Sequence, residues 1–254
     1  MKVTFLGTGT SQGVPVIACQ CVVCTSNDSR DNRLRSSVMF ELNDKVLVID
    51  AGPDFRYQML RAKVTQLDAI LFTHEHKDHV AGLDDIRAFN FKHDREIDLY
   101  AERRVQQALK NEFAYIFSEL QYPGLPRVIL NDIDGSTLHI QGVAVTPIQT
   151  MHYKLPVFGF RINDFTYITD AKTISAQEKE KIKGSKILVL NALRKEPHIS
   201  HFSLSEAIAL AQEIGAEQTY FTHISHQLGL HDEVQSQLPE NIYLAYDGLT
   251  IEIN

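Results

Sequence analysis

A run of histidines and an aspartate near position 75 has the residue types and spacing of a two-metal site. The segment Thr73-His74-Glu75-His76-Lys77-Asp78-His79 contains the pattern H-x-H-x-D-H. His74 and His76 are two positions apart, so an extended backbone directs both imidazoles to one side and lets them share a metal ion. Asp78 and His79 follow where the chain enters a predicted helix, so they can reach a second ion about 3.5–4 Å from the first. Imidazoles and a carboxylate together suit zinc, manganese or iron.

A second group of metal-binding residue types lies near the N-terminus. Cys19, Cys21 and Cys24 are the chain's three cysteines, and they fall within six positions. An odd number of cysteines in so short a segment is poorly explained by a disulfide framework. Buried thiols that only pack, or a reactive catalytic thiol, are the less favoured alternatives. The sequence therefore predicts that these cysteines bind a metal ion.

Alternating or continuous apolar runs and turn residues predict the elements that must hold these groups. Predicted strands cover residues 4–6, 37–42, 45–50, 67–72, 97–100, 137–148, 157–162, 165–169, 186–191, 218–222 and 242–252. Predicted helices cover residues 55–63 with Asp54 as the N-cap, 82–91, 102–120, 175–182 and 203–214.

Two segments of the chain echo one another. Ile70-Leu71-Phe72-Thr73-His74 is mirrored by Thr219-Tyr220-Phe221-Thr222-His223, so each is a predicted strand that delivers a histidine just past its end. Loops at strand ends are where rigid scaffolds hold catalytic groups. Two similar halves, with sheets inside and helices outside, would bring both histidines to a shared edge.

Length and composition limit the class of protein. The chain has 254 residues, 44% of them hydrophobic and 22% charged, which is typical of a globular protein. No low-complexity linker divides it, so we expect a single domain over residues 1–254. The net charge of −7 argues against a broad surface for duplex nucleic acid. No apolar run approaches the roughly 20 residues that span a bilayer, and the apolar start is too short for a secretory signal, which predicts a cytoplasmic location.

At the H-x-H-x-D-H motif the chain resembles the metallo-β-lactamase superfamily. The resemblance implies an α/β (α+β) fold, a four-layer αβ/βα sandwich with two mixed sheets inside and helices on both outer faces. It also implies that a mid-chain histidine, a bridging aspartate and a late histidine complete the ligand set, and His152, Asp170 and His223 match these in order. By this resemblance one ion is bound by His74, His76 and His152, the other is bound by Asp78, His79 and His223, and Asp170 bridges them. Asp50 matches an aspartate that orients ligands by hydrogen bonding.

The N-terminal segment narrows the resemblance. Phe5-Leu6-Gly7-Thr8-Gly9 and Gly13-Val14-Pro15 are similar to the opening of the phosphodiesterase branches, which include tRNA 3′-processing endonucleases and PhnP-type cyclic phosphodiesterases. The cysteine spacing is similar to that of the PhnP-type enzymes. In these enzymes a late histidine completes a structural zinc site, and His226 matches that histidine. Three thiolates and one imidazole form a closed tetrahedral site that contributes folding energy.

The resemblance also assigns groups around the substrate. It implies that His201 lies over the metals and transfers a proton or contacts phosphate, with His198 as a competitor for that role. Lys154 is expected to hold a phosphate oxygen, and a solvated surface lysine is the alternative. Glu75 and Lys77 stand where PhnP-type enzymes commonly have an aromatic and an apolar residue, so details of the substrate pocket do not carry over.

The predicted activity is hydrolysis of a small or cyclic phosphate diester, of the phosphoribosyl 1,2-cyclic phosphate or cyclic nucleotide type, by a metal-activated water. Asp78 acts as a metal ligand and His201 as the general acid. The predicted cofactors are two divalent ions, zinc or manganese, in the active site and one structural zinc. The expected partner is the small diester, with no extended nucleic acid and no membrane, and PhnP-type relatives suggest a homodimer.

Two other functions stay open at this point. A tRNA 3′-processing nuclease is disfavoured by the acidic balance and by the lack of an inserted Gly/Pro-rich arm. A non-catalytic member of the fold that binds a nucleotide or cofactor is disfavoured by the complete ligand set.

Overall fold

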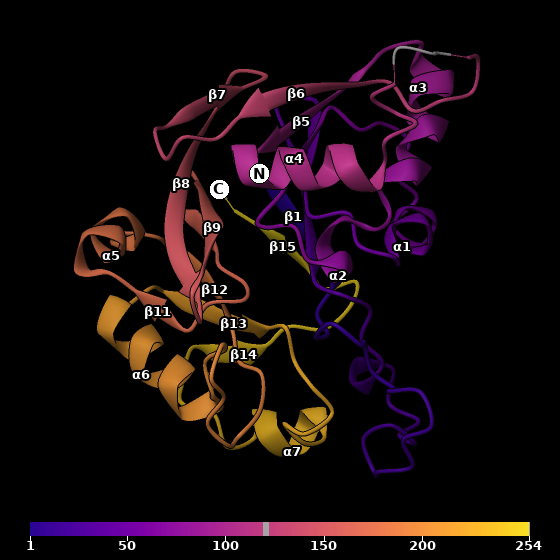
Figure 1. Ribbon diagram of the computed structural model, residues 1–254. Coiled ribbons are helices and arrows are strands. Elements are labelled where there is room, and N and C mark those ends of the chain that lie inside the picture. The colour runs from indigo at the N-terminus through magenta and orange to yellow at the C-terminus, as the bar shows by residue number, and fades with distance from the viewer. Residues whose placement is uncertain (119–121, 254) are drawn as a thin grey trace. The chain divides into compact units, whose positions relative to one another are not determined.

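The computed structural model describes residues 1–118 and 122–253 (Figure 1). The chain divides into two compact units that are each assembled from separate segments. Unit 1 comprises Met1–Leu6, Ser37–Asp134 and Thr250–Asn254, and unit 2 comprises Gly7–Ser36 and Gly135–Leu249. The expectation of a single domain over residues 1–254 stays a prediction.

Unit 1 is built on a seven-stranded sheet with the order β15-β1-β2-β3-β4-β5-β6. Its strands are β1 (Lys2–Gly7), β2 (Ser37–Leu42), β3 (Lys45–Ile49), β4 (Ala69–Leu71), β5 (Ile97–Ala101), β6 (Val128–Asp132) and β15 (Thr250–Glu252). The predicted hairpin β2–β3 is antiparallel, whereas β3 to β6 run parallel. Parallel strands are buried on both faces and so need continuous apolar runs. Leu47, Val48 and Ile49 of β3 are accordingly fully buried.

The helices of unit 1 pack on this sheet (Figure 1). They are α1 (Phe55–Arg61), α2 (Lys77–Val80), the 3-10 helix η2 (Leu83–Ile86), α3 (Arg87–His93) and α4 (Arg103–Glu112). One core cluster joins helix and strand side chains, among them Phe55, Phe89, Leu109, Ile70 and Leu99. The short helix α2 begins inside the histidine motif, ahead of the predicted helix 82–91, which the structure divides between η2 and α3.

Unit 2 contains the second mixed sheet, with the order β11-β8-β9-β10-β12-β13-β14 and β7 paired to β8. Its strands are β7 (Leu138–Ile140), β8 (Val143–His152), β9 (Leu155–Ile162), β10 (Phe165–Tyr167), β11 (Thr173–Ile174), β12 (Ile187–Asn191), β13 (Gln218–Thr222) and β14 (Ile242–Leu244). The antiparallel pairs are β7–β8, β8–β9, β9–β10 and β8–β11. The parallel pairs are β10–β12, β12–β13 and β13–β14.

The helices of unit 2 are the 3-10 helix η1 (Ser29–Asp31), α5 (Ala176–Ile182), α6 (Leu204–Ile214) and α7 (His231–Gln235). Helix α6 starts with a capping box in which Ser203 and Glu206 bond to each other's backbone N–H, and it ends at Gly215 in the left-handed conformation. The cap fixes the start of α6 two residues after His201. Phe202, between them, donates its N–H to the carbonyl of Ala171, so the position of His201 is tied to the loop after β10.

Several predicted elements are wrong in extent. The predicted strand 137–148 is the hairpin β7–β8, which turns at Gln141 and Gly142 with φ of 52° and 84°. The predicted strand 242–252 is two strands, β14 and β15, in different sheets, because Gly248 has φ 90° and Asp247 accepts hydrogen bonds from the N–H groups of Thr8 and Leu34. The predicted helix 102–120 ends at Glu112, where Phe113 leaves helical geometry. Residues 119–120 of that prediction lie outside the described residues. β6, β11, α2, α7 and the 3-10 helix η1 were not predicted.

The predicted fold class is confirmed, because two mixed sheets with helices account for the described residues. No helix among those residues has both the length and the apolar character that crossing a membrane requires.

Gly82 is expected to be essential for the packing of the turn that follows the histidine motif. Its φ of −91° suits any residue, but an added Cβ would overlap the carbonyl oxygen of Gly52 and lie 2.6 Å from the Cβ of Phe55. We predict that Gly82→Ala lowers the free energy of unfolding by about 1–3 kcal/mol through overpacking. Denaturant unfolding measures this, and an unchanged midpoint would contradict it.

Candidate metal centres

The metal-binding loop of unit 1, defined as residues 74–79, groups four predicted ligands. His74 Nε2 lies 3.0 Å from His76 Nδ1, close to the edge of about 3.3 Å between two nitrogens on one tetrahedral zinc ion. His79 Nε2 lies 3.1 Å from Asp78 Oδ2. The ring centroids of His74 and His79 are 4.3 Å apart. The extended backbone of His76, with ψ 148°, and the turn into α2 create this grouping.

Asp50 orients the metal-binding loop through hydrogen bonds. It follows β3 directly and is completely buried. Its Oδ2 accepts from His79 Nδ1 at 2.6 Å and from Thr73 Oγ1 at 2.9 Å, and its Oδ1 accepts from the Thr73 N–H at 2.9 Å. Burial raises the pKa of Asp50, and the contacts with His79 and Thr73 oppose that rise.

These hydrogen bonds decide which imidazole nitrogens can bind a metal. A carboxylate only accepts, so the ring proton of His79 is on Nδ1 and the Nε2 lone pair faces Asp78. The Thr73 hydroxyl donates to Asp50, so it accepts from His74 Nδ1 at 2.9 Å and leaves the Nε2 lone pair of His74 on the side of His76. Lone pairs gathered in this way fit a bound cation, since outer hydrogen bonds of this kind orient metal-binding imidazoles.

Unit 2 groups the other predicted ligands. Asp170 Oδ2 lies 3.2 Å from His223 Nδ1, and the donor atoms of His152, Asp170 and His201 all lie within 4.8 Å of one another. His152 Nδ1 donates to the carbonyl of Ser200 at 2.9 Å, which directs its Nε2 lone pair away from that loop. Asp170 and His223 are nearly fully buried. The set fits a divalent cation by its mixture of imidazole and carboxylate donors.

Three of these groups have left-handed backbones. Asp50, Asp170 and His223 have φ of 63°, 55° and 55°, and each lies just beyond a strand end. Non-glycine residues in this region cost free energy, and they cluster at functional sites that the surrounding structure over-determines.

His201 is buried among other histidines of unit 2. Its ring centroid is 4.5 Å from that of His152, 4.9 Å from that of His223 and 5.1 Å from that of His198. Burial lowers the pKa of His201 to about 3, although Asp170 raises it. Burial also lowers the pKa of His198. His201 is therefore neutral at pH 7 in the protein alone, and a general acid here needs a further anion in addition to Asp170.

Lys154 lies in the tight turn between β8 and β9. Its side chain is exposed, and its Nζ lies 5.3 Å from the ring centroid of Tyr153. Its predicted role in phosphate binding stays a prediction.

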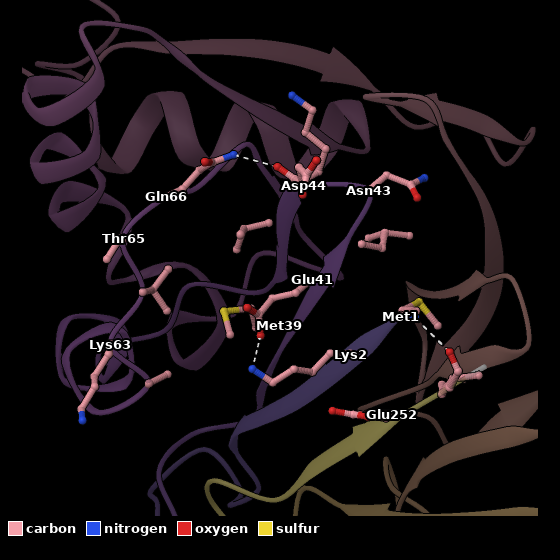
Figure 2. A pocket seen from close by; sticks show the side chains of 16 residues that line it. Met1, Lys2, Met39, Glu41, Asn43, Asp44, Lys63, Thr65, Gln66 and Glu252 are labelled. Carbon is pink, nitrogen blue, oxygen red and sulfur yellow. Dashed lines mark hydrogen bonds and ion pairs between the residues drawn. The ribbon is translucent and has the colours of Figure 1, made fainter.

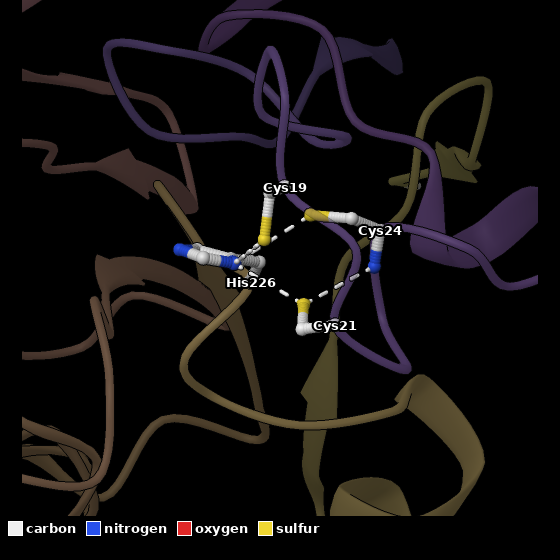
Figure 3. Close-up of side chains that lie close together, drawn as sticks. All are labelled: Cys19, Cys21, Cys24 and His226. Atoms are coloured by element: carbon white, nitrogen blue, oxygen red, sulfur yellow. Dashed lines mark hydrogen bonds between the residues drawn. The ribbon is translucent and has the colours of Figure 1, made fainter.

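The cysteine cluster, defined as Cys19, Cys21, Cys24 and His226, forms in unit 2 (Figure 3). The three sulfurs lie 3.4, 3.3 and 3.5 Å from His226 Nδ1, respectively. A tetrahedron with Zn–S of about 2.3 Å and Zn–N of about 2.0–2.1 Å has S···N edges of about 3.5 Å. The four donor atoms are therefore arranged as a closed metal site.

The acidities of the thiols also favour a cation. The N–H of Cys24, followed by His226, lowers the pKa of Cys21 to about 6, whereas burial raises the pKa of Cys24 to about 11. The protein alone thus favours the thiolate form of Cys21 but not that of Cys24. A bound cation would compensate for the negative charge of the three thiolates.

Backbone pairing explains how residues so distant in sequence meet in unit 2. Gly9 forms β-bridges with Arg35 and Ile224, and Thr10 N donates to the carbonyl of Ile224. Ile224 precedes His226 by two residues, so the pairing brings the cysteine segment to this histidine.

A buried arginine fixes the same segment. Arg33 is 4% exposed and donates to Thr8 Oγ1, to the carbonyl of Ala245 and to His231 Nδ1. Burial lowers the pKa of Arg33 to about 10 and the pKa of His231 to about 4. The imidazole therefore accepts as a neutral group.

A cavity of about 660 Å³ lies elsewhere in unit 1 (Figure 2). Asn43, Asp44 and Lys45 line it at the start of β3, at the opposite end of that strand from Asp50. Lys2 and Glu41 pair with each other at 2.7 Å on its wall. We assign no ligand to it, because the metal-binding groups of unit 1 follow the other ends of the strands.

The structure thus brings together four predicted ligands in unit 1, three in unit 2 and the whole cysteine cluster. That the first two sets share one pair of ions stays a prediction. Sequence reasoning missed Thr73, Thr169 and Asn191. Thr169 Oγ1 donates to Asp170 at 2.7 Å, and the Asn191 side chain bonds both backbone groups of Ala171. The available signal was a threonine directly before His74, Asp170 and His223.

Known proteins resemble this chain in fold and in sequence. Residues 45–224 match the family described as "Beta-lactamase superfamily domain". A crystal structure described as a new diphosphatase from the PhnP family is 39% identical, covers 100% of this chain and 98% of its own, and superposes with a TM-score of 0.94. The chain therefore belongs to the metallo-β-lactamase superfamily and, within it, to the PhnP family. The predicted fold and family are confirmed.

Two further relatives limit how much function can be transferred to this chain. A protein of Porphyromonas gingivalis strain W83 named octanoyltransferase is 39% identical over 252 residues, 98% of this chain and 51% of its own. Zinc-bound PqqB from Methylobacterium extorquens has a TM-score of 0.81 at 19% identity, with 100% of both chains covered, and shows the fold alone. The chain spans about half the length of the curated relatives that it matches.

Removal of one thiolate is expected to empty the cysteine cluster. Cys21→Ser should lose one zinc equivalent per chain by elemental analysis and lower the melting temperature, because the site contributes folding energy. Val22→Ser is the matched control, since Val22 is 66% exposed in the same segment. Equal zinc content in both variants would refute the assignment.

Loss of the Asp50 charge is expected to weaken metal binding in unit 1. Asp50→Asn should reduce the affinity for Co²⁺ about 10–100-fold, because ligand-orienting partners have effects of this size. Competition with a chromophoric chelator measures this. Asp44→Asn, in the exposed hairpin turn, should leave the affinity unchanged.

Proposed function

We propose that this chain is a metal-dependent phosphodiesterase that hydrolyses a small or cyclic phosphate diester. The observation that carries the proposal is the orientation of its imidazoles. Asp50, Thr73 and the carbonyl of Ser200 hold the ring protons of His79, His74 and His152 on Nδ1, which leaves each Nε2 as the metal-binding atom. Membership of the PhnP family supports the same reaction class.

We propose that the two ligand sets bind one pair of ions, zinc or manganese, with Asp170 bridging them. When bound, the ions would acidify a water molecule and offset charge on the non-bridging phosphate oxygens. Oxygen from water would then form a bond to phosphorus as the water loses a proton to solvent, the phosphorus–alkoxide bond would break, and the alkoxide would take up a proton.

His201 is proposed to supply that proton, with His198 as the other candidate. Its pKa is low because burial outweighs the nearby Asp170 carboxylate, and a phosphodiester beside the ring would add negative charge that favours the imidazolium form. The exposed Lys154 is proposed to contact a phosphate oxygen. We also propose that the chain forms a homodimer.

The name of the diphosphatase relative supports a second candidate, cleavage of a P–O–P bond. A phosphate leaving group is stable as an anion, so it needs less help from an acid than an alkoxide does. Loss of His201 should therefore affect the two reactions unequally. The relative named octanoyltransferase is about twice as long as this chain, which covers 51% of it, so its name does not assign octanoyl transfer to this chain.

Activity toward bis(p-nitrophenyl) phosphate tests the main proposal. We expect hydrolysis that requires added Zn²⁺ or Mn²⁺ and is abolished by a chelator. His201→Ala should lower kcat for alkyl diesters about 100–10,000-fold, and His198→Ala serves as the comparison.

The substrate panel should include ribose cyclic phosphates, 2′,3′-cyclic nucleotides, diphosphate diesters and precursor tRNA. A fully metallated sample that cleaves none of them sinks the proposal. Cleavage of precursor tRNA alone would favour the nuclease alternative. Tight nucleotide binding without turnover would favour a non-catalytic binder.

A further inference from the structure

Two charged residues of the metal-binding loop make ion pairs with helix α4. The H-x-H-x-D-H pattern leaves positions 75 and 77 without a ligand role. Their charges are opposite, and so are those of their partners: Glu75 Oε2 pairs with Arg104 Nη1, and Lys77 Nζ pairs with Glu112 Oε2. Side chains alternate along an extended backbone, so Glu75, between His74 and His76, is directed away from the metal side, toward α4. Lys77 is the first residue of α2 and reaches α4 through its pair with Glu112.

The Glu75–Arg104 pair is the better shielded of the two. The Glu75 side chain is 24% exposed and that of Arg104 is 32% exposed, whereas Lys77 is 72% exposed. Glu75 Oε2 and Arg104 Nη1 are both shielded from water. Exposed pairs contribute little, and shielding strengthens the attraction. Glu102 Oε2, 3.2 Å from Arg104 Nη2, braces the guanidinium from a second side.

Helix α4 places these charges against its own dipole. Arg104 is in its first turn and Glu112 is its last residue, although cations suit the C-terminal end of a helix and anions the N-terminal end. The pairs with the loop compensate for this unfavourable placement.

Helix α4 is also fixed in unit 1 by packing and hydrogen bonds. Val105 and Leu109 are fully buried. Gln106 donates to the carbonyls of Ala101 and Asn131 and to Asp132 Oδ1. A side chain fixed on this helix therefore holds whatever it contacts relative to the strands of unit 1.

We propose that Arg104 is a positioning residue, which holds the metal-binding loop in its ligand geometry through Glu75. The inference rests on the proposed function, because that assigns His74 and His76 as metal ligands on either side of Glu75. Arg104 acts through the loop and touches neither metal nor substrate.

The test compares Arg104→Gln with Arg103→Gln in the full chain. Arg103 is the matched control, since it is 88% exposed on the same turn and pairs with Asp132 rather than with the loop. We expect Arg104→Gln to bind Co²⁺ about 10-fold more weakly and to alter the visible spectrum of the Co²⁺-loaded protein. In the same variant kcat should fall while KM stays near its original value.

A charge reversal separates positioning from general stability. The double variant Glu75→Arg with Arg104→Glu should recover Co²⁺ affinity relative to Arg104→Glu alone, because both place a carboxylate beside Glu102 and only the double variant restores the pair with position 75. Equal Co²⁺ affinity and equal spectra for Arg104→Gln and Arg103→Gln would overturn the proposal, and so would a double variant no better than Arg104→Glu. A chain that binds Co²⁺ normally but cleaves no diester contradicts the proposed function and leaves this comparison intact.

Discussion

The arrangement of unit 1 depends on one buried carboxylate. Asp50 lies at the end of β3 without access to water, and an unpartnered charge there would be costly. Its partners come from the chain that follows the neighbouring parallel strand, β4, at the same edge of the sheet. Satisfying Asp50 therefore requires residues 73–79 to fold back over it, and that fold is what orients the imidazoles.

In unit 2 a neutral side chain, that of Asn191, fixes the loop that carries Asp170. Asn191 ends β12, and its amide bonds both backbone groups of Ala171, the residue after Asp170. An amide can donate and accept at once, so it fixes the loop without placing another negative charge beside Asp170. Asp170 and His223 keep strained backbones on either side of this arrangement. The chemistry of each half is thus held by hydrogen bonds to the loops that follow strands.

The sequence predicted the groups whose signal is local. The spacing of His74, His76, Asp78 and His79 and that of the cysteines could be interpreted without tertiary information, and the apolar runs located most strands. Resemblance to a family was needed for His226, which the structure places among the cysteines. It was also needed for His152, Asp170 and His223. Single residues at strand ends carry no periodic signal.

Long-range partners could not be predicted. The local sequence does not indicate that Thr73 donates a hydrogen bond to Asp50, 23 positions earlier, or that Arg104 forms an ion pair with Glu75. The division of residues 242–252 between two sheets was missed for the same reason. It depends on Asp247 accepting hydrogen bonds from segments more than 200 residues away.

The connectivity of the first sheet has a consequence for how the chain acquires its structure during synthesis. Lys2, Val3 and Thr4 of β1 pair with residues 250–252 of β15, so one edge of this sheet stays open while the ribosome makes everything between them. An open edge is a template for pairing with other chains. Until residues 250–252 are made, β1 therefore lacks its β15 partner and is itself the edge strand of this sheet.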